Sequence, residues 1–512
     1  MKRLLPFTLL AVLAAGCGEE QGGYQPSPAV RLTVGEGSHT TATILVESIY
    51  CDEVFVLAEE IAVIADSDRQ SPSAAQVISE GVPAGDGVAV LTGLMPGTRY
   101  TAFGVGRKGD KVSNVEKVNF TTSAQAGTLY PYEQGRDGAP FFADITLCPG
   151  GGVPNSNRWF TIPENWDKAR FAPHVSYKDE YGVSHWLFDA FLAITGTDPD
   201  RKTFCINAGG SLSADKESWS RLADYWAGPQ GAFKTLDEAI EEATFDISEP
   251  PGKRYAVMMI PDPIMFERFS DKSSSTKYWG AIDGVQMDFS KTEDQVKALE
   301  WYIDLVRAMF ARLECKHLEL AGFYIISEEL VATPQGWNYS QKRWDQILPP
   351  VGEYLDSCNE GLYWIPYLGA DGTSMWKELG ITYAWLQPGR YWDSGNSKPI
   401  DTSISTLGRL GMGIELEFEY SMVEDIMSIS GCMGPDAQGG YAFSLSDVPA
   451  LRARFREYMD AFKQGGLYGK RRIALYSGSN AMWQLANSPK TDDIAMYREL
   501  CRFISENPLK QR

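Results

Sequence analysis

The sequence has few of the side chains that bind transition metals. Only 4 histidines occur among 512 residues, so a metal centre built on several histidines is not expected, and Ser-His-Asp chemistry is equally disfavoured. The 8 cysteines contain no CxxC pair, and Cys17 lies in the amino-terminal leader, which leaves an odd set of seven. This set predicts neither a zinc site nor a full disulfide framework. We therefore expect no metal and no cofactor.

Positive charge is also scarce. Lys and Arg total 47 against 67 Asp and Glu, and the formal net charge is −20. A field of this sign repels phosphate groups, so we expect no nucleic-acid partner. No glycine-rich loop follows a predicted strand with the spacing of a dinucleotide or phosphate site, and no GxSxG nucleophile elbow occurs.

The apolar run at the amino terminus is too short to span a bilayer permanently. It covers residues 4–13, follows Lys2 and Arg3, and is succeeded by three small residues and Cys17. This order predicts a signal peptide over residues 1–16. The cysteine after small residues resembles the lipobox of bacterial lipoproteins, which implies lipidation at Cys17 and a membrane anchor. An ordinary secretory signal with an unmodified cysteine is the alternative.

The segment after the cysteine carries Glu19 and Glu20 and resembles the surface-export signal of Bacteroidota lipoproteins. That resemblance implies an outer-membrane lipoprotein exposed at the cell surface, with a periplasmic location as the alternative. Residues 17–28 are rich in Gly, Gln, Ser and Pro, a composition typical of a flexible tether.

The rest of the chain has enough apolar material to fold, with 44% hydrophobic and 22% charged residues. From residue 29 to residue 124 we predict an all-β domain with no helix. Its expected strands are 30–34, 43–46, 54–57 and 88–91. The segment 94–100 and the stretch 120–122 resemble the late strands of fibronectin type III domains, which implies a corner role for Tyr100 and a spacing function, with glycan binding as the alternative.

Residues 128–512 alternate short apolar runs with helical patterns, which predicts a parallel (β/α)₈ barrel of the TIM type. The eight expected strands are 143–148, 189–194, 255–261, 318–326, 362–368, 382–388, 411–419 and 472–477. Expected helices are 218–226, 236–243, 293–313, 344–357 and 448–464, with a short one near 166–171. The connection between the first two strands is the least regular.

Glutamates stand where two of these strands end. The fourth expected strand is followed by Glu328 and Glu329, and the seventh places Glu415, Glu417 and Glu419 at a period of two. That period directs all three to one face. We expect this face to be the lumen, because uncompensated charges would be costly on the outer face that helices cover.

Carboxylates after the fourth and seventh strands resemble the arrangement of retaining glycoside hydrolases in the large barrel clan. The resemblance implies Glu328 as acid/base and Glu417 as nucleophile, with Glu329, Glu415 and Glu419 as the next candidates. In that clan an Asn precedes the acid/base, whereas Ser327 stands here. The alternatives are helix capping, a surface strand or a structural cation site, and a non-catalytic glycan-binding barrel of a polysaccharide-utilisation system.

Aromatic and polar residues near the other strand ends suit a carbohydrate cleft, because sugar rings stack on aromatic rings and sugar hydroxyls need polar partners. The candidate substrate-binding residues are Asp189, His174, Asp262, Tyr324, Trp364, Tyr367, Trp385, Gln387 and Tyr476. Burial in the core or a local hydrogen bond is the alternative for each. A carbohydrate is the expected partner.

The blocks 186–192, 322–324, 413–418 and 476–481 look like those of a Bacteroidota lipoprotein family known only as domain of unknown function 4855. The resemblance covers about residues 128–505. It implies a glycoside-hydrolase-like barrel and an association with glycan use, and it names no substrate.

Overall fold

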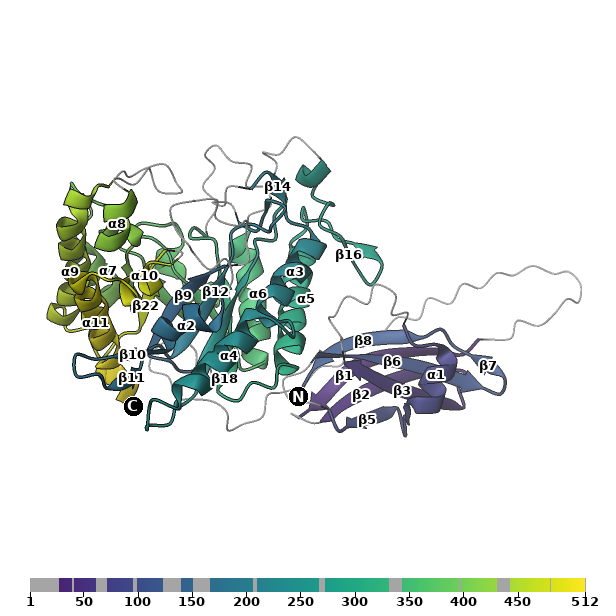
Figure 1. The fold of residues 1–512 in the computed structure, drawn as a ribbon. Helices are drawn as coiled ribbons and strands as arrows, with labels where there is room; N and C mark the ends of the chain where they lie inside the picture. Colours follow the sequence, from purple (N-terminus) through teal and green to yellow (C-terminus); the bar gives the residue numbers. More distant parts are fainter. Residues whose placement is uncertain are drawn as a thin grey trace, which may run out of the picture.

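The computed structural model describes residues 27–38, 41–60, 71–94, 99–122, 140–150, 166–205, 210–266, 272–330, 343–395, 397–430, 443–478 and 480–511. The expected signal peptide, Cys17 and most of the expected tether lie outside these ranges. The described chain forms an amino-terminal all-β unit and a larger α/β barrel (Figure 1).

The all-β unit consists of antiparallel strands in two sheets. One sheet contains β1 (Ala29–Gly37), β2 (Thr41–Ile49) and β5 (Val88–Thr92). The other contains β4 (Val82–Pro83), β3 (Glu53–Glu60), β6 (Arg99–Lys108) and β7 (Lys111–Val112), with β8 (Glu116–Thr121) paired to β6. The four strands expected from alternating apolar residues lie within β1, β2, β3 and β5.

A short helix in this unit corrects the expectation that it has none. Helix α1 (Ala74–Glu80) begins after Ser73, whose side chain accepts a hydrogen bond from the backbone of Gln76. Seven residues give too few turns for a helical period to stand out, and Val77 is the only buried residue of the helix. Tyr100 is buried in β6 and stacks on Phe120 with ring centroids 5.6 Å apart.

The second unit is a closed barrel of eight parallel strands. In chain order these are β9 (Asp144–Pro149), β12 (Ala190–Ile194), β15 (Arg254–Ile260), β18 (Leu318–Ile325), β19 (Gly361–Trp364), β20 (Tyr383–Leu386), β21 (Gly413–Glu417) and β22 (Ile473–Tyr476). Each lies at one of the eight predicted positions. Buried strands of this kind are short apolar runs, which is why the sequence pattern located them.

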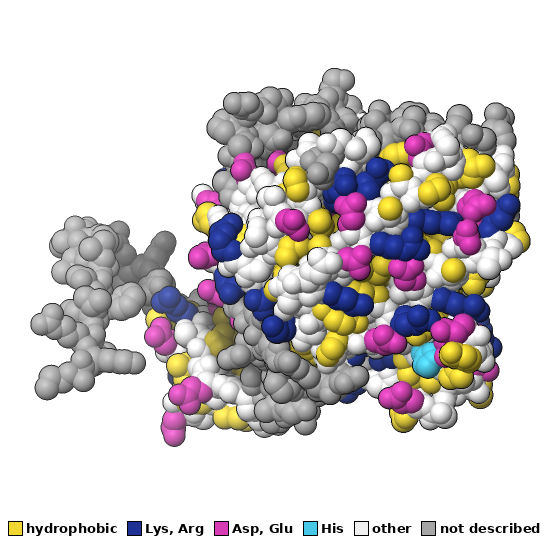
Figure 2. All heavy atoms as spheres, turned by 90° about the vertical axis from the view of Figure 1, so that its left-hand side faces the viewer, with side chains coloured by type: hydrophobic (Ala, Val, Ile, Leu, Met, Phe, Trp, Pro, Cys, Tyr) yellow, Lys and Arg dark blue, Asp and Glu magenta, His cyan; other side chains and the backbone are white. Residues whose placement is uncertain are grey.

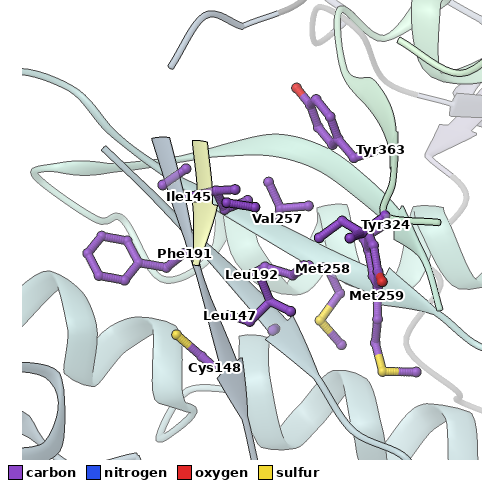
Figure 3. Packing of buried hydrophobic residues seen from close by; sticks show 14 of the residues in the cluster. Ile145, Leu147, Cys148, Phe191, Leu192, Val257, Met258, Met259, Tyr324 and Tyr363 are labelled. Atoms are coloured by element: carbon purple, nitrogen blue, oxygen red, sulfur yellow. The ribbon is translucent and has the colours of Figure 1, made fainter. Parts of the chain in front are cut away.

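Side chains alternate between the lumen and the surrounding helices along these strands. Leu192 pairs with Leu147 on β9 and with Val257 on β15, and the three share the lumen face. Figure 3 shows Phe191 turned away from them, and its ring meets that of Phe171 outside the barrel at 6.3 Å. The lumen is therefore a packed core over most of its depth.

Helices follow most of the strands. They are α2 (Lys168–Val175), α3 (Lys216–Ala227), α4 (Ala232–Ala243), α5 (Thr292–Ala311), α6 (Trp344–Ser357), α7 (Ile400–Leu410), α8 (Glu424–Ser430), α9 (Val448–Gln464), α10 (Ala481–Ala486) and α11 (Thr491–Ser505). The least regular described connection joins β19 to β20, where the fully described segment contains only the 3₁₀ turn Thr373–Met375. Helix α2 lies in the β9–β12 connection, where the sequence pattern predicts a short helix near residues 166–171.

Short strand pairs and turns complete the barrel unit. The pairs are β10 (Ser176–Lys178) with β11 (Ser184–Trp186), β13 (Lys202–Thr203) with β14 (Leu212–Ser213), and β16 (Ala281–Ile282) with β17 (Val285–Gln286). The remaining 3₁₀ turns are Lys272–Ser274, Tyr420–Met422, Leu445–Asp447 and Pro508–Gln511.

A register shift in β18 lies on the strand that leads to Glu328. Ala256 pairs with Leu320 and Val257 with Gly322, so Ala321 is an extra residue on β18. Gly322 has φ 143° and lies so close to β19 that a Cβ atom would be 2.0 Å from the carbonyl oxygen of Gly361. Bulges of this kind redirect a strand and its side chains next to active sites.

The surface of the barrel mixes both signs of charge. On the side formed by α9 and α11, basic and acidic side chains are interspersed (Figure 2), and Arg456 pairs with Glu499 at 2.8 Å. The six cysteines within the described ranges form no disulfide bond with one another. No helix in the described part of the chain is both long enough and apolar enough to cross a membrane.

Candidate active site

The ends of β18 and β21 bring three glutamates to one region of the barrel mouth. Gly413, Glu415 and Glu417 alternate with outward residues of β21, and Phe418 packs on Phe455 of α9 with ring centroids 5.1 Å apart. Glu415 and Glu417 therefore face the lumen. Glu328 follows the end of β18, and the charge of Glu417 acts directly on its carboxyl. The structure thus brings together residues that are 89 positions apart in the printed sequence.

Glu417 is held rigidly and has no exposed surface. Its Oε2 atom accepts a hydrogen bond from the backbone N–H of Gly389 at 2.6 Å and another from the hydroxyl of Tyr458 at 2.8 Å. Burial raises the pKa of Glu417 to about 7, and these two hydrogen bonds, the positive charge of Lys398 and a further hydrogen bond from the indole of Trp392 oppose that rise. Donors aimed at one oxygen favour the ionised form of this carboxyl.

Glu328 differs from Glu417 in its exposure and in its hydrogen-bond partners. It is partly exposed, and no hydrogen bond or cation among the described residues acts on its carboxyl. Burial, then the charge of Glu417, then that of Glu329 raise the pKa of Glu328 to about 7. A carboxyl that is protonated near neutral pH and unengaged can donate its proton to a ligand, whereas Glu417 is fixed as an acceptor.

The two outer glutamates are each engaged by a tyrosine. Tyr367 donates to Oε1 of Glu329, and Tyr476 donates to Oε1 of Glu419 at 3.0 Å. Glu419 also lies against Gly478, where a Cβ atom would be 2.3 Å from a carboxylate oxygen. These contacts place all four residues at the mouth, and they tie Glu329 and Glu419 to neighbours rather than to the centre between Glu328 and Glu417.

Ser327, which departs from the Asn of the clan pattern, anchors the segment that carries Glu328. Its hydroxyl lies 2.9 Å from both carboxylate oxygens of Asp262, and its carbonyl accepts a hydrogen bond from the indole N–H of Trp364 at 2.8 Å. Asp262 and Trp364 are both buried. They therefore hold this segment in place, and their expected contact with a sugar stays a prediction.

Two further candidates belong to the packed lumen. Trp385 is 1% exposed and stacks on Phe142 with ring centroids 6.1 Å apart, so it is a core residue rather than a sugar platform. Tyr324 is buried on β18, where the charges of Glu328 and Glu415 act on its hydroxyl. Gln387 is half-buried just beyond β20, and its backbone N–H donates to the carbonyl of Pro366.

Asp189 lies at the opposite end of the barrel from the glutamates. It precedes β12 and accepts hydrogen bonds from the backbone of Ala143 and from Lys510, both at 3.0 Å. Lys510 also pairs with the buried Asp144 at 2.7 Å. The expected role of Asp189 in substrate binding is therefore corrected to closure of the barrel base, because side chains before a strand and after it lie at opposite ends of a parallel barrel.

His174 is also removed from the candidate site. It is buried on α2 behind β9, and its Nδ1 atom lies 3.0 Å from the hydroxyl of Thr146. Burial lowers the pKa of its imidazole to about 3, so the ring is neutral at physiological pH. His174 is therefore a core histidine with a local hydrogen bond, which is the alternative to substrate binding given in the sequence analysis.

Sequence reasoning missed two of the groups that hold Glu417. Gly389 lies in the loop after β20, and Tyr458 is on α9, 41 residues beyond the glutamate it contacts. Tyr458 sits among apolar residues at helical spacing and so carries no signal that separates it from the core.

In the part of the chain that the structure describes, no three His, Cys, Asp or Glu side chains are grouped so as to hold a metal ion.

Comparison with known proteins gives a family and structural neighbours. A family model described as "Domain of unknown function (DUF4855)" matches residues 160–432, slightly more than half of the chain. No curated protein matches the chain.

The chain is similar to solved fibronectin type III structures, all with a TM-score of 0.15. The fn3 domain of human collagen alpha-1(XX) is 19% identical, with 20% of this chain and 90% of that chain covered. The domain of human fibronectin type III domain containing protein 3 is 16% identical, with 22% and 97% covered. A two-domain segment of chicken tenascin is 20% identical, with 19% and 50% covered.

Proposed function

The chain belongs to the DUF4855 family, whose name carries no activity, and from the barrel mouth we propose that it is a glycoside hydrolase of the retaining type. The observation that supports this most is the difference between its two central carboxyls. Burial raises the pKa of both carboxyls to about 7, but Glu417 is fixed by hydrogen-bond donors, whereas Glu328 has no such partner among the described residues. Both retaining and inverting hydrolysis need one carboxylate and one carboxylic acid, and the retaining assignment follows the resemblance to the barrel clan.

In this mechanism Glu417 attacks the anomeric carbon while Glu328 protonates the departing glycosidic oxygen. The glycosyl-enzyme ester that forms on Glu417 is then attacked by water, and Glu328, now ionised, takes the proton of that water. Gly389 and Tyr458 orient the attacking carboxylate through the oxygen that they share. Tyr367 and Tyr476 are the aromatic candidates that are partly exposed at the mouth.

A non-catalytic glycan-binding barrel is the second candidate. The burial of Glu417 favours it, because a nucleophile with no exposed surface meets a sugar only if its surroundings rearrange. In that case the aromatic and carboxylate residues of the mouth would bind a glycan without cleaving it.

We further propose that the protein is a lipoprotein anchored through Cys17 and displayed at the outer-membrane surface, with the periplasmic face as the alternative. The all-β unit would then be a fibronectin type III-like spacer between the anchor and the barrel. The leader pattern in the printed sequence and the antiparallel strands of residues 29–121 support this arrangement.

The test is hydrolysis by residues 18–512 of a panel of plant, microbial and host polysaccharides, with products detected by mass spectrometry. Glu328→Gln and Glu417→Gln should each lower turnover by about a thousandfold or more, because each removes an essential group. Glu319→Gln is the matched control: it lies on β18 as well, but its side chain is 47% exposed and pairs with Lys253. It should leave turnover unchanged.

The roles of the two glutamates can be separated with azide. Added azide should restore turnover in Glu417→Ala and give a product of inverted anomeric configuration, because it replaces the nucleophile. Turnover that persists in both glutamine variants would refute the assignment. Glycan binding without any product from the parent protein would support the second candidate instead.

A further inference from the structure

A third carboxyl, Glu415, lies below Glu417 on the lumen face of β21. It is 2% exposed. The described titratable groups that interact with it electrostatically are two carboxyls, those of Glu417 and Glu328, and three tyrosine hydroxyls, those of Tyr324, Tyr458 and Tyr476. These five groups come from β21, β18, α9 and β22, and none is a cation.

Both glutamates of β21 carry a buried oxygen without a close hydrogen bond. These atoms are Oε2 of Glu415 and Oε1 of Glu417, whereas Oε2 of Glu417 is occupied by Gly389 and Tyr458. The indole of Trp392 also acts on the carboxyl of Glu417 as a hydrogen-bond donor. Residues two apart on one strand lie about 6.6 Å apart along it and on the same face. Two glutamate side chains are long enough to bring these oxygens together.

We propose that Glu415 is a positioning residue that keeps its proton and, as a neutral carboxylic acid, donates a hydrogen bond to the Oε1 atom of Glu417. The proposal deepens the proposed function, because it assigns the second oxygen of the nucleophile. One proton between the two carboxyls satisfies both oxygens at once. Without it, two ionised carboxylates would be buried side by side.

The proton belongs on Glu415 because the two sites differ in their donors. Glu417 already receives hydrogen bonds from Gly389, Tyr458 and the indole of Trp392 that favour its ionised form, whereas Glu415 receives none from described residues. Burial, then the charges of Glu417 and Glu328, raise the pKa of Glu415 well above its usual range. Buried carboxyls can stay neutral at physiological pH and serve as hydrogen-bond donors.

Infrared spectroscopy of the protein without any glycan tests the protonation directly. At pH 9, where Glu328 and Glu417 with their pKa values of about 7 are ionised, the parent should still show the carbonyl stretch of a protonated carboxyl. Glu415→Gln should remove that band. Glu360→Gln is the matched control, since Glu360 is also buried but pairs with Arg307 at 2.8 Å, and it should leave the band unchanged.

Activity tests the positioning role. Glu415→Gln keeps a neutral donor and should retain kcat/KM within about threefold, whereas Glu415→Leu should lose about tenfold or more in kcat with KM little changed. The pH profile adds a second readout. Glu415→Gln should leave both limbs in place, whereas the loss of an ionised carboxylate would lower the pKa of Glu328 and move the alkaline limb to lower pH.

A parent spectrum without the band, or a band that survives Glu415→Gln, would overturn the proposal, as would a shifted alkaline limb. If no glycan is hydrolysed, the proposed function fails, yet the infrared result still decides whether Glu415 holds its proton. The two failures are therefore distinguishable.

Discussion

Replacing the proposed nucleophile should make the barrel more stable while abolishing its activity. Glu417 is completely buried, and its pKa is raised from 4.5 to about 7. Each pKa unit corresponds to about 1.36 kcal/mol, so the ionised side chain destabilises the folded state by about 3 kcal/mol above pH 7. Glu417→Gln removes this cost, and the amide oxygen can still accept the hydrogen bonds from Gly389 and Tyr458.

The stability difference between the parent and Glu417→Gln should depend on pH. Below about pH 4.5 the carboxyl is protonated in both folded and unfolded chains and contributes nothing. Between about pH 4.5 and 7 the unfolded chain releases the proton while the folded chain retains it, so the stability of the parent falls as pH rises. The advantage of Glu417→Gln should therefore be absent at pH 4, grow through this window, and level off at about 3 kcal/mol above pH 7.

Urea unfolding followed by tryptophan fluorescence measures this effect in the barrel alone, because all 14 tryptophans lie after residue 150. Glu360→Gln is the control with the opposite sign: it removes the 2.8 Å ion pair of Arg307, which keeps only Asp304 at 3.9 Å, and should destabilise the barrel. A difference between Glu417→Gln and the parent that is zero, negative or independent of pH would refute the reasoning.

Three further outcomes are expected. Hydrolysis should have a kcat/KM that falls above about pH 7 as Glu328 loses its proton; an alkaline limb several units higher in initial-rate measurements would contradict this. Gly322→Ala should lower the free energy of unfolding by about 2 kcal/mol or more, since its Cβ would strike the backbone of β19, while Gly395→Ala, in open surroundings, should be nearly neutral in urea melts. Lys510→Met should destabilise the barrel by about 3 kcal/mol at pH 8 and by less at pH 4, where Asp144 is protonated; an equal loss at both pH values would disagree.

Local patterns were sufficient for most of the fold. All eight barrel strands and the helices α3, α4, α5, α6 and α9 were predictable from apolar periodicity, because a buried strand or an amphipathic helix imposes its period on neighbouring residues. Helix α1 was missed because it is only seven residues long with a single buried side chain. The β19–β20 connection was not foreseen either, since a 3₁₀ turn has no comparable period.

Some residues of the candidate site were also predictable from local sequence spacing, and others were not. The period of two in β21 is sufficient to place Glu415 and Glu417 on the lumen face, and the end of β18 places Glu328. By contrast, Trp364 and Trp385 could be read equally as sugar platforms or core residues. Their burial depends on what surrounds them, and sequence spacing does not contain that information.

The sequence by itself determined which strands form and which of their faces carry carboxyl groups, because alternation is a property of a few adjacent residues. Only the tertiary structure decided the chemical state of each carboxyl. In the folded protein, Tyr458 and Gly389 donate hydrogen bonds to Glu417, and no described cation lies beside Glu415. Asp189 accepts a hydrogen bond from Lys510 at the opposite end of the barrel. Desolvation and hydrogen bonding depend on groups that are distant in the chain, and folding alone brings them together.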